Sequence, residues 1–187
     1  KERRLAHMLP YVSLVNAITI RTRGNELMQC LRLEGVDSTT SEDSHLDRVG
    51  AILAGVVAQV GTEFSFYLHK VSKAVDTDLP PIPGEGFAAA VDARWQADLA
   101  KGGLRDKTLT LSVLERPDPG SRIPFAANLS RRRLAADTAR RLRKLDEVVG
   151  FLLSSFADLK PRLLSAESGE LLGFLGSLNT GEEHPLS

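Results

Sequence analysis

The residues with the most evident chemistry in this sequence form a basic cluster between positions 131 and 144. Seven basic residues stand there against one acid, Asp137; they are Arg131, Arg132, Arg133, Arg140, Arg141, Arg143 and Lys144. Such a cluster can bind the phosphates of nucleic acid, lipid headgroups or an acidic patch on a partner protein. It can equally be the solvated face of a long helix, whose arginine stems cover apolar surface.

We interpret the basic cluster first as the solvated start of a long helix. Among the binding alternatives, a protein partner or membrane headgroups are favoured over nucleic acid. The nearest aromatic residues are Phe125 and Phe151, so none is interleaved with the basic residues to stack bases. Nucleic-acid binding through residues 131–144 therefore stays the alternative function.

Motifs for nucleotide, metal and covalent chemistry are missing from the sequence. None of the 15 glycines precedes a lysine, as the phosphate-binding loop of nucleotide hydrolases requires. Gly84-Glu-Gly86 falls in a proline-rich stretch rather than directly after a strand. The four histidines lie far apart without metal-ligand spacing, and no G-x-S-x-G elbow is present. The sequence predicts no catalytic residue, no metal ligand and no cofactor in these residues.

The single cysteine, Cys30, excludes an internal disulfide and a four-thiolate zinc site. It lies in an apolar-alternating run, so we predict a small buried hydrophobic residue in a protein of a reducing compartment. His69 lies in a predicted strand, where a solvated or hydrogen-bonded role is expected. Both residues are thus interpreted as structural.

Three segments have the alternating pattern of strands. A hairpin is predicted from a β-branched run over 12–20, turn residues over 23–26 and leucines at even spacing up to position 33. Further strands are predicted over 64–71 and 108–116. In the last of these, Leu109, Leu111 and Val113 are expected to point inward and the hydroxyl side chains outward.

Helical periodicity follows or separates these strands. Helices are predicted over 46–60, 87–99, 135–159 and 170–178, with Gly61 and Pro161 as end signals. The helix over 87–99 has Phe87, Val91, Trp95 and Leu99 at four-residue spacing. The long helix carries a heptad seam from Ala135 to Leu159, which we expect to pack on its own sheet rather than on another chain.

The sequence thus predicts an α+β fold, with an antiparallel or mixed sheet in ββαβαβ order and helices on one face. A long C-terminal helix and a short helix follow, as a second layer or an arm. Residues 1–130 are expected to form the sheet domain and residues 131–187 a helical extension. The 187 residues carry 24 basic and 24 acidic side chains, which excludes a dedicated polycation that coats nucleic acid. The longest apolar run, 51–58, is far too short to span a membrane.

The order and spacing of several motifs resemble a known family. They are Leu9-Pro-Tyr11, the hairpin through Leu33-Glu-Gly35, the segment 87–99 with Trp95, the strand ending at Arg116-Pro117, and Glu170-Leu-Leu-Gly-Phe-Leu-Gly-Ser-Leu178. Together they resemble the amino-terminal domain of the large VirB-type ATPase (CagE/TrbE/VirB) of type IV secretion and conjugative transfer systems.

The resemblance implies a non-catalytic docking and assembly domain at the cytoplasmic face of the bacterial inner membrane. The implied partners are inner-membrane secretion subunits and other protomers of the same ATPase, in a homo-oligomer that is peripheral to the membrane. In that family a RecA-like motor, which binds ATP and Mg²⁺, follows a segment like 170–178. The whole protein would power pilus biogenesis and the translocation of DNA or protein.

Overall fold

The structure is a computed structural model that describes residues 9–35, 42–74, 80–84, 86–102, 105–117 and 131–181. Within Arg131–Ser155 it does not describe the side chains of residues 131–133. The chain divides into two compact units. The first comprises residues 1–69 and 109–187, and the second residues 70–108.

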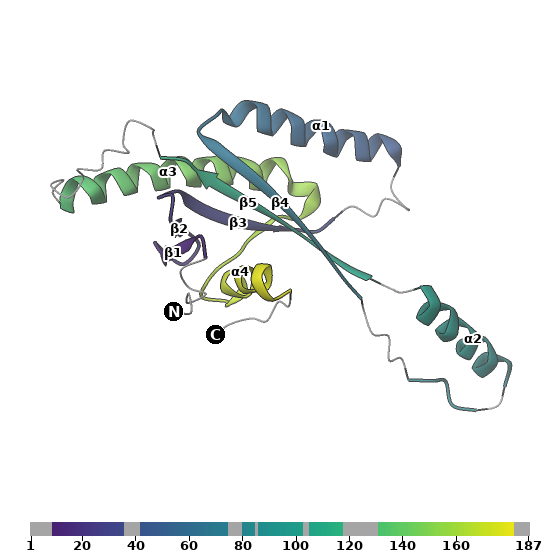
Figure 1. Ribbon diagram of the computed structural model, residues 1–187. Helices are drawn as coiled ribbons and strands as arrows, with labels where there is room; N and C mark the ends of the chain where they lie inside the picture. Colours follow the sequence, from purple (N-terminus) through teal and green to yellow (C-terminus); the bar gives the residue numbers. More distant parts are fainter. Residues whose placement is uncertain are drawn as a thin grey trace, which may run out of the picture. The chain divides into compact units, whose positions relative to one another are not determined.

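An antiparallel sheet forms the centre of the first unit (Figure 1). Its strands follow the order β1–β2–β3–β5–β4, and β6 pairs with β3 outside this path. Their bounds are β1 Tyr11–Leu14, β2 Ile20–Thr22, β3 Leu27–Leu33, β4 Phe64–Ala74, β5 Arg105–Glu115 and β6 Arg162–Leu163. Strand β3 is central: Leu27 lies opposite Glu115 and Leu33 opposite Leu109, and every residue of β3 is buried.

The predicted hairpin is present, but its first strand is divided. Residues 15–19 form a bend between β1 and β2, so the front of the fold is a three-stranded meander rather than one two-stranded hairpin. The amide of Val15 donates to the carbonyl oxygen of Thr19 at 2.8 Å and closes the bend. The turn from β2 to β3 lies where the sequence predicts it, with Asn25 in the left-handed region at φ 61°.

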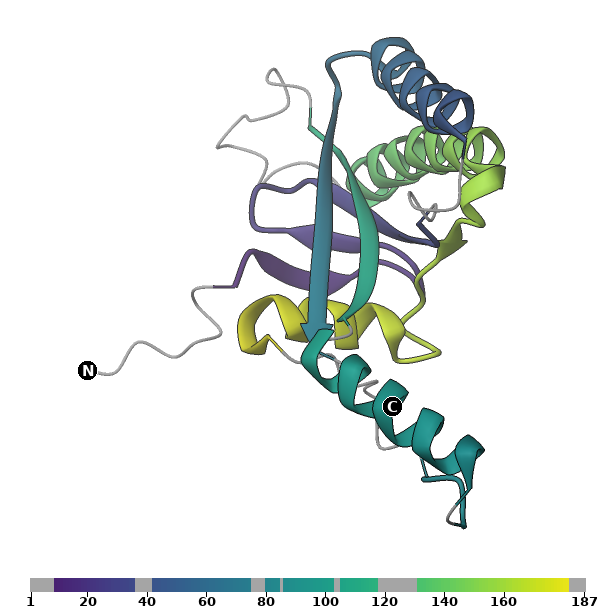
Figure 2. The same cartoon turned by 90° about the vertical axis from the view of Figure 1, so that its right-hand side faces the viewer.

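Helices cover both faces of the sheet. Helices α1 (Asp43–Val60) and α3 (Arg131–Ser155) lie on one face, and α4 (Glu170–Thr180) lies on the other (Figures 1 and 2). A 3-10 turn, Ala157–Leu159, follows α3 before the chain crosses to the opposite face. The α+β class and the antiparallel sheet are confirmed. Of the alternatives that the sequence leaves open for the last two helices, α4 forms a second layer on the opposite face.

Each face of the sheet has its own hydrophobic core. The core under α1 and α3 contains Leu27, Leu31, Leu33, Val56, Phe64, Leu111, Val113, Leu145, Val149, Leu152, Phe156 and Leu159. The core under α4 contains Ile20, Met28, Cys30, Leu114, Leu164, Leu171, Phe174 and Leu175. Cys30 is therefore the buried hydrophobic residue that the sequence predicts.

The two cores explain one wrong prediction about β5. Its hydroxyl residues Thr110 and Ser112 were expected to face outward, but both are buried. An alternating strand has a polar outer face only where nothing covers that face. Ser112 pairs with Cys30 across the ladder and lies on the face that α4 covers.

The long helix α3 belongs to the compact first unit. Its heptad seam is buried against the sheet from Leu145 onward, so the seam packs on its own chain as expected. Residues 131–181 thus share the first unit with β1, β2 and β3, and the expected boundary near residue 130 does not separate the two compact units. Among the described residues, no helix has the length and apolar character needed to cross a membrane.

The second unit consists of β4 from Lys70, helix α2 (Phe87–Gly102) and β5 up to Thr108. The helix lies where the sequence predicts it. The amide of Ile82 donates to Asp92 at 3.1 Å, and Gln96 donates to the same carboxylate at 2.8 Å. Asp92 on α2 therefore holds the segment 80–84 against the helix.

Candidate functional site

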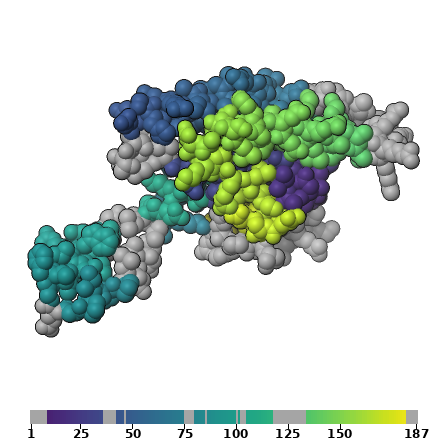
Figure 3. Space-filling model, turned by 180° about the vertical axis from the view of Figure 1, so that it is seen from behind, coloured from purple at the N-terminus to yellow at the C-terminus, as the bar shows by residue number. Residues whose placement is uncertain are grey.

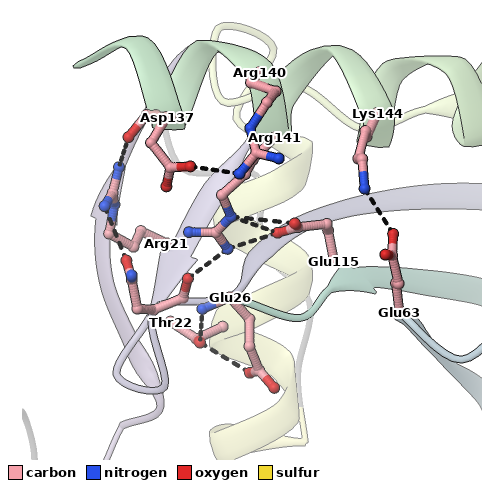
Figure 4. Close-up of polar contacts among 11 residues, drawn as sticks. Arg21, Thr22, Glu26, Glu63, Glu115, Asp137, Arg140, Arg141 and Lys144 are labelled. Atoms are coloured by element: carbon pink, nitrogen blue, oxygen red, sulfur yellow. Dashed lines mark hydrogen bonds and ion pairs between the residues drawn. The ribbon is translucent and has the colours of Figure 1, made fainter. Parts of the chain in front are cut away.

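The predicted basic cluster lies on the first half of α3. Of its seven residues, Arg131, Arg132 and Arg133 have side chains outside the described part of the structure. The other four are described and have different environments, and Figure 4 shows three of them, Arg140, Arg141 and Lys144.

Arg141 is buried and anchors α3 to the sheet. Its Nε donates to both carboxylate oxygens of Glu115 on β5, at 3.1 Å and 2.8 Å, and its Nη2 donates to Oε2 at 2.5 Å (Figure 4). Nη2 also donates to the carbonyl oxygen of Asn25 at 2.7 Å. Arg141 and Glu115 are each 5% exposed. This planar guanidinium–carboxylate pair fixes α3 against β5. The buried guanidinium of Arg141 is not accessible to an external phosphate.

The exposed basic residues of the cluster also have acidic partners. Arg140 lies 2.7 Å from Asp137 on the same helix, and Lys144 lies 2.8 Å from Glu63 before β4 (Figure 4). Arg143 is exposed and makes no ion pair within the described part of the chain. Carboxylates thus offset three of the four described positive charges, which weakens the attraction of this surface for an anion.

Polar contacts to the β2–β3 hairpin fix the rest of α3. Arg21 donates to Thr138 at 3.2 Å and to the side chain of Asn25 at 2.9 Å. Gln29 on the buried strand β3 donates to Asp146 at 2.7 Å. Sequence reasoning missed Arg21, Gln29 and Glu115, because their partners on α3 lie 26 or more positions away in the chain. The available signal was a polar residue, Gln29, inside an otherwise apolar strand.

A cavity of about 300 Å³ opens on the α4 side of the sheet. Its lining comes from β1 and the turn after β2, and from β3, β4 and β5: Pro10, Tyr11, Thr22, Arg23, Gly24, Glu26, Met28, Tyr67, His69, Ser112 and Leu114. A pocket of this size lies at the lower end of the range for small-molecule sites. It can accept one large side chain of a partner or a small ligand.

Three polar side chains on neighbouring strands, Cys30, Ser112 and His69, form a row at the edge of this cavity. Ser112 Oγ lies 3.2 Å from His69 Nε2 and 3.4 Å from Cys30 Sγ. The ring of His69 also packs edge-on against Phe174 of α4, with 5.3 Å between ring centroids. His69 thus has the hydrogen-bonded role that the sequence predicts.

Burial shifts the pKa values of two side chains in this row, Cys30 and His69. It raises the pKa of the Cys30 thiol to about 11, and it lowers the pKa of the His69 imidazole below 6.5. At neutral pH the thiol is protonated and the imidazole is uncharged. A protonated, fully buried thiol is a poor nucleophile, so this geometry supports packing and recognition rather than covalent chemistry.

A second apolar depression lies between β1 and α4. It has a volume of about 260 Å³ and is lined by Leu9, Tyr11, Val12, Ser13, Leu14, Ile20, Leu172, Leu175, Gly176 and Asn179. In Figure 3 the yellow residues of α4 lie beside the purple residues of β1. Within the described residues β1 pairs only with β2, so its other edge is open, and the strand Tyr-Val-Ser-Leu carries no charge.

Two comparisons with known proteins indicate the family of this chain. Residues 18–122 match the family described as type IV secretion system ATPase VirB4/TrbE, N-terminal domain. Over 169 residues the chain is 25% identical to the type IV secretion system protein virB4 of Bartonella quintana (strain Toulouse). That alignment covers 87% of this chain and 21% of the relative, so the chain spans about a fifth of the relative's length. Because the family match covers more than half of its residues, the chain belongs to the N-terminal domain family of the VirB4/TrbE type IV secretion ATPases.

Proposed function

We propose that the chain is the docking and assembly domain of a type IV secretion ATPase and is not itself catalytic. It works at the cytoplasmic face of the bacterial inner membrane, where it contacts inner-membrane secretion subunits and neighbouring ATPase protomers. ATP and Mg²⁺ are bound by a RecA-like domain that follows such a domain in the family. Hydrolysis there powers pilus biogenesis and the passage of DNA or protein.

The observation that carries this proposal is the uncharged outer edge of β1, which no other described strand pairs with, beside the apolar depression between β1 and α4. Strand β1 is short and irregular between Tyr11 and Ser13, which limits pairing at this edge, but it has no charged residue or proline within the strand to block it. Here Val12 and Leu14 are exposed, and the depression beside them accepts apolar side chains. An extended segment of a secretion subunit can add to β1 through main-chain hydrogen bonds, with alternate side chains in the depression.

The nucleic-acid alternative gains little support from the described part of α3, where Arg143 is exposed and makes no ion pair but the other described basic residues have carboxylate partners. Arg141 is buried, and Arg140 and Lys144 lie next to carboxylates. A phosphate contact at either exposed residue would have to compete with that carboxylate. The described surface therefore favours docking to a protein partner over binding to nucleic acid.

The test is retention of inner-membrane subunits of the same secretion system. The purified chain is mixed with those subunits in detergent, and the retained subunits are detected with antibodies. We expect the wild-type chain to retain at least one subunit, and the double variant Val12→Lys and Leu14→Lys to lose it, because lysine blocks strand addition at an edge.

Val57→Lys is the matched control, since Val57 is exposed to a similar extent but lies on α1, on the other face of the sheet. It should retain the subunit, and circular dichroism should show all variants folded. Retention by the β1 variant, or none by the wild type, would contradict docking at this edge. ATP turnover by the purified chain would contradict its non-catalytic role.

A further inference from the structure

The cavity of about 300 Å³ on the α4 side of the sheet is lined by one carboxylate, that of Glu26, and lies within the first compact unit. Thr22 Oγ1 donates to Glu26 Oε2 at 2.9 Å and orients this half-buried carboxylate (Figure 4). Within the described residues Glu26 makes no ion pair, and its Oε1 accepts no hydrogen bond. The cavity therefore offers an oriented negative charge that a cationic group can pair with.

Aromatic rings line the same cavity. Tyr11 and Tyr67 contribute phenol rings, and His69 contributes an imidazole. The face of a tyrosine ring carries partial negative charge and attracts a cation that lies over it. Because burial lowers the pKa of His69, its imidazole is uncharged at neutral pH and does not repel a cation. The carboxylate and the aromatic rings together favour a positively charged ligand.

Arg23 is the one positively charged residue among the described residues that line the cavity. Its Nε donates to the carbonyl oxygen of Leu9 at 2.6 Å, and its main-chain amide donates to that of Pro10 at 2.7 Å. These contacts join the turn after β2 to the segment before β1. The side chains of Arg23 and Glu26 form no ion pair, so the Glu26 carboxylate stays available to a ligand.

Among biological cations, the arginine side chain suits this lining best. Its planar guanidinium stacks on an aromatic ring while two of its N–H groups bind one carboxylate, whereas the ammonium of lysine is a compact, strongly hydrated charge. The cavity has room for one large side chain. Phosphates of nucleic acid or lipid would be repelled by the Glu26 carboxylate. The lining therefore points to a basic segment of a partner protein.

We propose that this cavity binds an arginine side chain of a partner protein, with the guanidinium paired to Glu26 and stacked on a tyrosine ring of the lining. The site is distinct from the outer edge of β1, although Tyr11 lines both depressions. The proposal goes beyond docking at that edge, and failure to retain inner-membrane subunits there would leave it unaffected. One side chain makes few contacts, so an isolated arginine derivative should bind with a Kd in the millimolar range.

Titration of the chain with N-acetyl-arginine methylamide, followed in amide NMR spectra, tests the proposal. The amide signals of Gly24, Glu26 and Tyr67 should shift and reach saturation, because these residues line the cavity. N-acetyl-citrulline methylamide is the matched ligand control, since citrulline has nearly the shape of arginine but no charge. It should bind about tenfold more weakly or not at all. Equal binding of the two ligands, or no saturable shift with the arginine ligand, would overturn the proposal.

Two variants test the groups that would hold the guanidinium. Glu26→Gln keeps an oxygen that accepts from Thr22 but removes the charge, so it should weaken binding of the arginine ligand by about tenfold or more. Tyr67→Leu removes an exposed ring and should weaken binding by about threefold. Glu167→Gln is the matched control variant, because Glu167 is exposed and does not line the cavity, and it should bind like the wild type.

The spectrum of each variant also reports whether the chain is folded, since a folded chain gives dispersed amide signals. Binding that is unchanged in Glu26→Gln, or weakened equally in Glu26→Gln and Glu167→Gln, would overturn the proposal. Inorganic phosphate provides the last comparison. If phosphate shifted the same signals more strongly than the arginine ligand, the cavity would be an anion site and the proposal would be wrong.

Discussion

Arg141 of α3 and Glu115 of β5 form a buried ion pair that joins the long helix to the sheet, with a closest contact of 2.5 Å. Removing one partner of such a pair leaves the other charge buried and unpaired. We therefore expect Arg141→Met to lower the free energy of unfolding by about 3–5 kcal/mol. Urea denaturation followed by circular dichroism measures this change.

Two further variants separate charge burial from loss of packing. The double variant Arg141→Met and Glu115→Leu should recover most of the loss, because no isolated charge then remains buried. Lys144→Met removes an exposed ion pair of the same helix and should change stability by less than about 1 kcal/mol. Equal effects of Arg141→Met and Lys144→Met would show that the pair with Glu115 is not a special anchor.

Phe174 connects α4 to the second core. It is 1% exposed and contacts the ring of His69 and the guanidinium of Arg32. Phe174→Ala should destabilise the protein by about 3–5 kcal/mol, the usual cost of removing a buried aromatic ring. Leu178→Ala on the exposed end of the same helix should cost about 0.5 kcal/mol or less in the same unfolding measurement. Similar costs for both would mean that α4 is not held by its apolar face.

Cys30 should be chemically silent in the folded chain. Burial raises the pKa of its thiol to about 11, so at pH 8 a disulfide reagent should label it only as fast as the protein unfolds. The raised pKa contributes stability that is present below pH 9 and is lost as the pH rises toward 11. Cys30→Ala should lack this alkaline part of the pH dependence. Rapid labelling of the native protein would contradict the burial.

His69 should make the protein sensitive to mild acid. Burial lowers the pKa of its imidazole below 6.5, so the unfolded chain takes up a proton more readily than the folded one. The resulting stability is present above pH 6.5 and is lost as the pH falls through the lowered pKa. His69→Gln keeps a hydrogen-bonding group and cannot titrate, so its urea midpoint should fall less than that of the wild type between pH 7.5 and pH 5. Equal falls would contradict the prediction.

Local pattern was sufficient to predict most elements of the fold. Helices α1, α2, α3 and α4 and strands β3, β4 and β5 lie where periodicity places them, with ends displaced by a few residues. The errors came from contacts between distant segments. The hydroxyls of Thr110 and Ser112 are buried because the chain returns some 60 residues later to cover that face. The sequence of β5 alone therefore does not indicate that α4 covers this face.

For the candidate site, too, the local pattern is predictable from the sequence and the contacts between distant segments are not. The basic cluster is evident in the sequence, but the sequence does not show that Arg141 has a buried carboxylate partner in Glu115. The spacing of Phe87, Val91, Trp95 and Leu99 predicts a helix, yet spacing alone does not show whether these apolar side chains are covered. Their exposure depends on what else packs on α2, which only the three-dimensional arrangement reveals.

The pairing of β6 with the central strand β3 has a consequence for how the protein is made. Leu31 pairs with Leu163, and Leu27 packs in one core with Phe156. During synthesis the early strands therefore leave the ribosome more than 100 residues before their last neighbours. Until then the apolar side chains of β3 lack part of their cover, and surface of this kind makes a nascent chain prone to aggregation.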